Sequence, residues 1–160
     1  MKSLVVFYLR TGTTRTVAEA VSERLGSDVD EIHDTRDRRG FIGWMSAGRD
    51  AGKRKLTTIK DVTKDPGQYD LVVIGTPVWN NTVSTPIRTY IAQHRDRLNE
   101  VAFFCTQDTE KSRVFEEEEL LVGRKPVATL ALRKKADVEE EDYEKLVMGL
   151  LSVCRNKLFC

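Results

Sequence analysis

The sequence predicts an α/β protein in which helices cover both faces of a doubly wound, five-stranded parallel sheet. Five short segments have the continuous apolar character of strands that are buried on both faces. These segments are residues 3–8, 29–33, 70–75, 101–106 and 127–132. Four of them precede stretches with helical periodicity, and strands that alternate with helices form the βαβ units of a parallel sheet.

Helical periodicity follows the first, third, fourth and fifth predicted strands. Apolar residues recur every three or four positions within Thr13–Leu25, within Thr85–His94 and within 114–122, where the polar side carries a run of glutamates. The most regular apolar stripe lies between Tyr143 and Cys154. We therefore expect helices at these four places.

The connection after the second strand is less regular. A charged stretch at 35–40 precedes Phe41, Trp44, Met45 and Gly48, whose spacing suggests a helix with small residues on one side. The basic residues at 53–55 would suit the end of that helix, where positive charge is favoured.

Composition limits the class of protein. With 160 residues, of which 40% are hydrophobic and 32% charged, the chain is expected to form a single globular domain over 1–160. A net charge of +1 gives no general attraction to nucleic acid or membranes. No apolar run is long enough to span a bilayer, and the first one stops at Arg10, too early for a signal peptide. Three cysteines without a CxxC pair fit the reducing cytoplasm, and Cys105 fits a buried apolar position.

The turn at residues 9–14 is the most informative feature of the chain. It reads Leu-Arg-Thr-Gly-Thr-Thr and joins the first strand directly to a helix. The first N–H groups of a helix lack partners, so such a turn forms an anion site at the carboxyl edge of the sheet. Gly12 would let a ligand approach the backbone, and the neighbouring threonine hydroxyls could donate to phosphate oxygens. An ordinary helix cap is the alternative.

A second polar connection, TPVWNNTVSTP at 76–86, follows the third strand. Trp79 stands outside any periodic core pattern and could offer a flat face for stacking, or else simply cover a helix end. Asn80 and Asn81 are residues that tolerate a left-handed backbone in a turn. Ligands of such sheets bind outside the carboxyl ends of the strands, where the connections 9–14, 76–85 and 106–113 would meet.

The two connections together resemble the flavodoxin family. The match comprises YLRTGTTRTVAEAV, YDLVVIGTPVWNNTVSTPIRTYI and, between them, FIGWMSAGRDAGKRKL, and it covers essentially the whole chain in order. The resemblance implies a flavodoxin-like fold with strand order 2-1-3-4-5 and non-covalent binding of FMN. The chain departs from the family pattern at Leu9, at Asn81 and in a third connection without glycine.

The resemblance also implies roles for residues in all three connections. Thr11, Gly12, Thr13 and Thr14 would hold the FMN phosphate, with Leu9 and Arg10 opening the loop. Trp79 would stack on the flavin. The residues that would shape the loop around the ring are Thr76, Pro77, Val78, Asn80, Asn81 and Thr82, and those near its other edge are Thr106, Gln107 and Asp108.

Three functions remain open from the sequence. The first is an electron carrier that needs no catalytic acid or base, because the flavin carries the chemistry. This agrees with the two histidines, His33 and His94, which no nucleophile motif accompanies. The second is an NAD(P)H-dependent quinone or flavin reductase, and the third is a flavin-free binding or scaffold module. A phosphate-loop NTPase is excluded because G-x-x-x-x-G-K-[ST] is absent.

The expected partners follow from charge. Redox proteins, or a small quinone or nicotinamide, are expected, with no nucleic acid or membrane, and the chain is expected to be a monomer or weak dimer. Seven basic residues cluster after the second strand: Arg36, Arg38, Arg39, Arg49, Lys53, Arg54 and Lys55. This cluster is most simply a solvated surface. The alternative is a contact site for an acidic protein or an anionic nucleotide such as NADPH.

Overall fold

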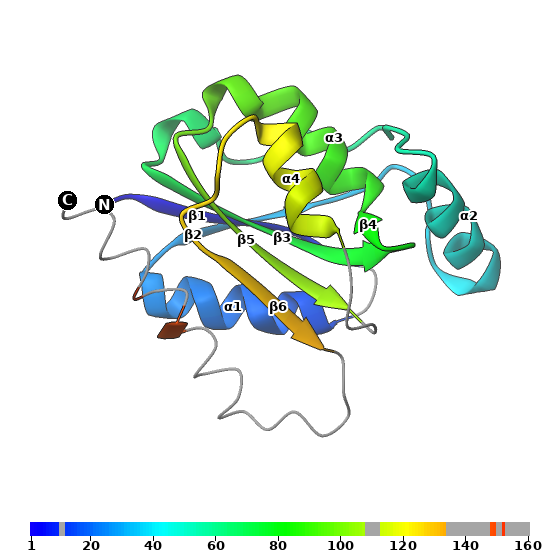
Figure 1. Ribbon diagram of the computed structural model, residues 1–160, viewed down its shortest axis with the longest axis horizontal. Helices are drawn as coiled ribbons and strands as arrows, with labels where there is room; N and C mark the ends of the chain where they lie inside the picture. The colour runs from blue at the N-terminus through cyan, green and yellow to red at the C-terminus, as the bar shows by residue number, and fades with distance from the viewer. Residues whose placement is uncertain (10–11, 108–112, 134–147, 150–151, 153–160) are drawn as a thin grey trace.

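The computed structural model describes residues 1–9, 12–107, 113–133, 148–149 and 152 (Figure 1). Its sheet has the strand order β2-β1-β3-β5-β6, and all neighbouring pairs in this path are parallel. The strands are β1 (Ser3–Tyr8), β2 (Asp28–Ile32), β3 (Leu71–Trp79), β5 (Glu100–Gln107) and β6 (Thr129–Arg133). The predicted order of five parallel strands is confirmed, with strand ends displaced by a few residues.

Helices cover both faces of this sheet. They are α1 (Thr13–Leu25), α2 (Gly40–Gly52), α3 (Thr85–His94) and α4 (Val114–Val122), with short 3₁₀ turns at Pro66–Gln68 and Arg95–Arg97. α1 lies on one face, and α3 and α4 lie on the other (Figure 1). The predicted helix between Tyr143 and Cys154 lies almost entirely outside the described residues. None of the described helices has the length and apolar character needed to cross a membrane.

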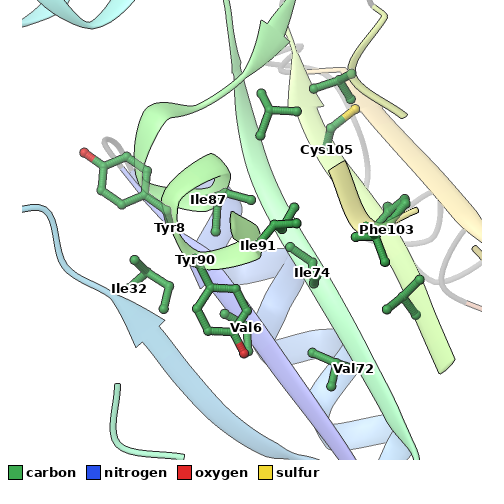
Figure 2. Packing of buried hydrophobic residues seen from close by; sticks show 14 of the residues in the cluster. Val6, Tyr8, Ile32, Val72, Ile74, Ile87, Tyr90, Ile91, Phe103 and Cys105 are labelled. Carbon is green, nitrogen blue, oxygen red and sulfur yellow. The ribbon is translucent and has the colours of Figure 1, made fainter. Parts of the chain in front are cut away.

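The alternation of side chains along the strands builds a core on each face. Figure 2 shows Ile87, Tyr90 and Ile91 of α3 over Val6 and Ile74 of β1 and β3, all fully buried. On the opposite face, the other strand residues pack against the buried stripe of α1. Both faces of the central strands are therefore buried, which explains why their sequences are continuously apolar.

The predicted loop at 76–85 is in part wrong. β3 continues to Trp79 and turns back into β4 (Thr82–Val83), which pairs antiparallel with it through Val78–Val83 and Trp79–Thr82. The extension forms because Thr76 and Pro77 still pair with β5, so the strand leaves the sheet only after them. The second connection is therefore a β-hairpin.

α2 confirms the predicted helix with small residues on one side, and it ends at Gly52, next to the basic residues 53–55 that are expected at its end. Its buried face consists of Gly43, Ala47, Asp50 and Ala51. A Cβ atom on Gly43 would stand 2.4 Å from the carbonyl carbon of Arg38, so only glycine permits this close packing. α2 lies to the side of the molecule, beyond the end at which β3 and β4 turn (Figure 1).

Candidate functional site

The carboxyl ends of β1, β3 and β5 bring the three predicted connections to one edge of the sheet. The hydroxyls of Thr14 and Thr106 are hydrogen-bonded across this edge at 2.9 Å, and both side chains are buried. This bond joins the start of α1 to the end of β5. The first and third predicted segments therefore meet, with the hairpin of β3 and β4 beside them.

The start of α1 has the geometry of an anion site. The carbonyl of Gly12 accepts hydrogen bonds from the N–H groups of Arg15 and Thr16. The N–H groups of Thr13 and Thr14 donate to no acceptor among the described residues. Gly12, the N-cap residue of α1, is exposed and has no side chain that could cap the helix. Open space lies where a Cβ would stand. The backbone is thus accessible to a ligand that accepts hydrogen bonds.

The threonine hydroxyls at this turn are not equivalent. The hydroxyl of Thr14 is held by Thr106, whereas Thr13 is half-buried and its hydroxyl has no partner among the described residues. Leu9 packs against the core on the α1 side of the sheet. Arg10 and Thr11 lie outside the described residues, as does Asp108 in the third connection.

The tip of the hairpin has the left-handed backbone that its two asparagines predict. Asn80 and Asn81 have φ angles of 49° and 60°. Two consecutive positive φ angles are typical of the type I′ turn that joins two strands most tightly. A Cβ on Gly52 would stand 2.3 Å from the side-chain nitrogen of Asn80, so glycine lets the end of α2 touch the turn.

Glu117 connects α4 to the hairpin of β3 and β4. Its Oε2 accepts hydrogen bonds from the hydroxyl of Thr82 and, at 3.1 Å, from the N–H of Val83. Its Oε1 lies 2.7 Å from Nη2 of the buried Arg88 and 3.2 Å from Nε of the exposed Arg54. Sequence reasoning missed Glu117 because it belongs to a run of four glutamates that looks like a solvated helix face. Its helical position beside Val114 and Leu121 is the only signal that could have identified it.

Trp79 is buried, with 7% of its surface exposed. Its ring makes a T-shaped contact with Tyr8, with centroids 5.4 Å apart, and the guanidinium of Arg38 lies 6.0 Å from its centroid. Trp79 also lines a hollow of about 510 Å³ between the hairpin and α2, together with Trp44 and Met45. Sequence reasoning did not place these two α2 residues at the site.

Arg38 anchors the segment that precedes α2. It is buried, and it donates to Asp34 at 3.0 Å and to Asp50 at 2.8 Å. Burial acts to lower the pKa of Arg38, but the hydrogen bonds to Asp50 and Asp34 outweigh it and raise this pKa above its ordinary value. The bond from Arg38 likewise holds the pKa of Asp50 below its usual range. The network keeps a cation beside Trp79.

A second hollow, of about 530 Å³, lies on the α4 side of the hairpin. Its wall combines charged side chains with the apolar Leu120 and Leu121. The residues that line it are Gly52, Arg54, Asn80, Asn81, Thr82, Arg88, Arg113, Glu116, Glu117, Leu120 and Leu121. The hairpin tip therefore stands between two hollows and contributes Asn80 and Asn81 to both.

The other predicted site residues lie deeper. Thr76 is fully buried, and its hydroxyl is hydrogen-bonded to that of Ser84 at 2.8 Å, which closes the base of the hairpin. Pro77 and Val78 are half-buried, and Gln107 is buried. Cys105 is fully buried, and burial raises the pKa of its thiol to about 12. This confirms the expectation of a buried apolar position for Cys105.

Known proteins share this architecture. No protein-family model matches the chain, and a search of curated proteins finds no match. Among solved structures, a flavoprotein from Lactobacillus acidophilus NCFM, crystallised in complex with FMN, is 24% identical with a TM-score of 0.71, covering 91% of this chain and 97% of that one. A WrbA-like flavodoxin from Agrobacterium tumefaciens is 14% identical with a TM-score of 0.62, covering 97% and 98%. A flavodoxin from the domain Archaea is 14% identical with a TM-score of 0.56, covering 98% of both chains.

The class of protein follows from the fold. The chain has the flavodoxin-like α/β fold, and its structural neighbours are flavodoxin-like flavoproteins. The resemblance that the two connections predicted is thus confirmed at the level of the fold.

Proposed function

We propose that the chain, as a single domain, binds one FMN non-covalently and passes electrons between redox partners in the cytoplasm. The observation that carries the proposal is that two features meet at one edge. These are the N–H groups of Thr13 and Thr14, which donate to no acceptor among the described residues, and the hairpin 76–83. The FMN complex of a structural neighbour that spans nearly the same length supports the choice of ligand.

The residues present fit the proposed cofactor. The N–H groups at the start of α1, which meet no acceptor in the part of the chain that the structure describes, suit a phosphate dianion, with exposed Gly12 beside them. The hollow that Trp79 lines is aromatic and apolar on one side, which suits a planar ring. Bound FMN would supply the capacity to take up one or two electrons.

The protein's own contribution is to position and bind. The phosphate turn is held by the Thr14–Thr106 bond, so its donors need not reorganise when an anion arrives. The hairpin is held by Glu117 and presents the peptide between Asn80 and Asn81 as the candidate hydrogen-bonding group for the ring. The buried cation of Arg38 would favour an electron-rich ring nearby.

Gly12→Ala tests the proposal without disturbing the fold. A Cβ at this position meets nothing within 4 Å and the backbone is right-handed, so the free energy of unfolding should change by less than about 1 kcal/mol. If the phosphate rests on this backbone, the methyl group obstructs it, and the Kd for FMN should rise roughly tenfold. Riboflavin lacks the phosphate, so its Kd for the native chain should be higher than that of FMN. Gly12→Ala should leave the Kd for riboflavin unchanged.

Flavin fluorescence quenching measures both affinities. Gly67→Ala is the matched control, because its Cβ would meet only ordinary contacts of 3.4 Å or more and it lies in the 3₁₀ turn before β3, at the amino edge of the sheet. Equal binding of FMN and riboflavin by the native chain would refute the phosphate assignment. A chain that binds neither flavin would be the flavin-free module instead.

A reductase is the second candidate, and the paired hollows favour it. With one hollow on each side of the hairpin, a ring could occupy one and a small quinone or nicotinamide the other. Rapid reduction of bound FMN by NAD(P)H alone would establish the reductase. Reduction only through a second protein would establish the carrier.

A further inference from the structure

The outward face of α2 is apolar where the helix begins. Phe41 is 73% exposed and Ile42 is 83% exposed, and more than half of the surface of Trp44 and Met45 is also exposed. We call these four residues the α2 apolar patch. The rings of Phe41 and Trp44 stack with centroids 6.1 Å apart. Because the inward face uses glycine and alanine, the helix is packed with its large apolar side chains facing out, an arrangement that marks an interaction surface.

The surroundings of the patch are basic. Residues 34–55 contain seven arginines and lysines and three aspartates, a net charge of +4 in a chain whose net charge is +1. Two of the aspartates, Asp34 and Asp50, already bond the buried Arg38. Asp50 also lies within 4 Å of the charged groups of Arg36, Arg49 and Lys55, so one carboxylate is shared among several cations. The charged residues of 34–55, which we call the basic rim of the patch, therefore keep an excess of positive charge.

We propose that the α2 apolar patch with its basic rim is the docking surface for an acidic partner protein. The role of that protein as electron donor or acceptor rests on the function proposed above. Charge complementarity selects the partner: an acidic surface would be attracted to the rim, and its apolar side chains would cover the patch.

Two other occupants fit less well. A second copy of the chain would bring one basic rim against another, which like-charge repulsion disfavours. A membrane-bound helix needs an apolar face along its length, but here the apolar character ends at Met45 and the exposed side continues with Arg49 and Gly52. An exposed carboxylate, Asp37, also lies beside the patch in contact with Arg39.

The position of the patch agrees with this role. Trp44 and Met45 belong both to the patch and to the hollow that Trp79 lines. A protein seated on the patch would therefore cover the mouth of the proposed ring site, and a short distance to the cofactor is what a redox partner requires.

Binding of a small acidic plant-type [2Fe–2S] ferredoxin to the apo protein tests the docking surface, with affinity measured by calorimetry at low and high ionic strength. Ile42→Ser removes apolar area and Arg39→Glu reverses a rim charge, and neither side chain belongs to the proposed cofactor site. Lys125→Glu is the matched control, with the same charge change just before β6, at the amino edge of the sheet. Each α2 variant should raise the Kd roughly five- to tenfold, and the control should not.

The outcomes separate the alternatives. Absence of ferredoxin binding at low ionic strength, or equal losses in Arg39→Glu and Lys125→Glu, would overturn the proposal. Binding to phosphatidylserine vesicles that Ile42→Ser abolishes, without ferredoxin binding, would assign the patch to a membrane. Concentration-dependent dimers lost in Ile42→Ser would assign it to a second copy. A parallel FMN titration keeps the two proposals distinct, because failure to bind FMN refutes the cofactor site while ferredoxin binding remains measurable.

Discussion

At the scale of single residues, the most unusual group is the carboxyl of Glu118. It is fully buried between α4 and the sheet, and neither of its oxygens has a hydrogen-bond partner among the described residues. Burial, together with the charge of neighbouring Glu117, raises the pKa of Glu118 well above its ordinary value. Cys105 on β5 is the other titratable group that interacts with it. The carboxyl of Glu118 therefore keeps its proton to a higher pH in the folded chain than in the unfolded chain.

Glu118 should make stability depend on pH. Above about pH 4.5 the unfolded chain releases this proton while the folded chain keeps it, so the free energy of unfolding falls by about 1.4 kcal/mol per pH unit until the folded pKa is reached. Glu118→Gln should remove this slope and be more stable than the native chain at pH 7, but not at pH 4. Urea unfolding at several pH values measures the effect. Glu116→Gln, on the exposed side of the same helix, should leave the slope intact. Equal slopes in the native chain and Glu118→Gln would contradict the assignment.

At the scale of elements, the hairpin of β3 and β4 depends on α4. Only two residue pairs connect its strands, and an isolated hairpin of this size is not stable in water. Glu117 adds contacts to this short ladder. It accepts hydrogen bonds from Thr82 and Val83, and it forms an ion pair with the buried Arg88. The stability of the hairpin therefore depends on its contact with α4.

Glu117→Gln should test this dependence. The amide can still accept from the N–H of Val83 but no longer balances the charge of Arg88, so the free energy of unfolding should fall by about 3 kcal/mol. Hydrogen exchange at the N–H of Val83 should accelerate more than exchange at Val73 in the centre of the sheet. In the double variant Glu117→Gln/Arg88→Met, part of the lost stability should return because no unpaired buried charge remains. A single variant as stable as the native chain would show that α4 does not hold the hairpin.

The hairpin also shows what the sequence could predict for an element. The left-handed turn at Asn80 and Asn81 is predicted correctly, since few residue types tolerate positive φ. The extension of β3 is missed because Pro77 and the polar residues around it are typical of loops. The role of Glu117 is missed because a glutamate in a run of four looks like part of a solvated helix face. Its helical position beside Val114 and Leu121 is the one local sign of burial, and its contact with Thr82 is long-range.

At the scale of the whole molecule, the parallel sheet and the edge that carries the site follow from the alternation of apolar strands with helices, whereas the strand order is implied by the family resemblance. That pattern is local, and it is strong in each unit. The orientation of α2 is harder to predict from the sequence, because periodicity shows that a helix has two different faces but does not show which face is buried. The close approach of Gly43 to Arg38 decides this in favour of the small residues. The burial of Trp79 against Tyr8 likewise depends on a contact between two strands that are neighbours in the sheet but far apart in the sequence.

The proposed cofactor should stabilise the entire fold, because its site is assembled from β1, the hairpin and β5, which come together only in the folded chain. With free FMN at one hundred times its Kd, the free energy of unfolding should rise by about 2.7 kcal/mol. For a chain of this size the midpoint of thermal unfolding should then increase by roughly 5–10 °C. Differential scanning calorimetry with FMN, riboflavin and inorganic phosphate at equal concentrations distinguishes the contributions. FMN should give the largest increase, because it engages both the turn at Gly12 and the hollow beside Trp79. An equal increase with inorganic phosphate alone would mean that the anion turn binds independently of any ring.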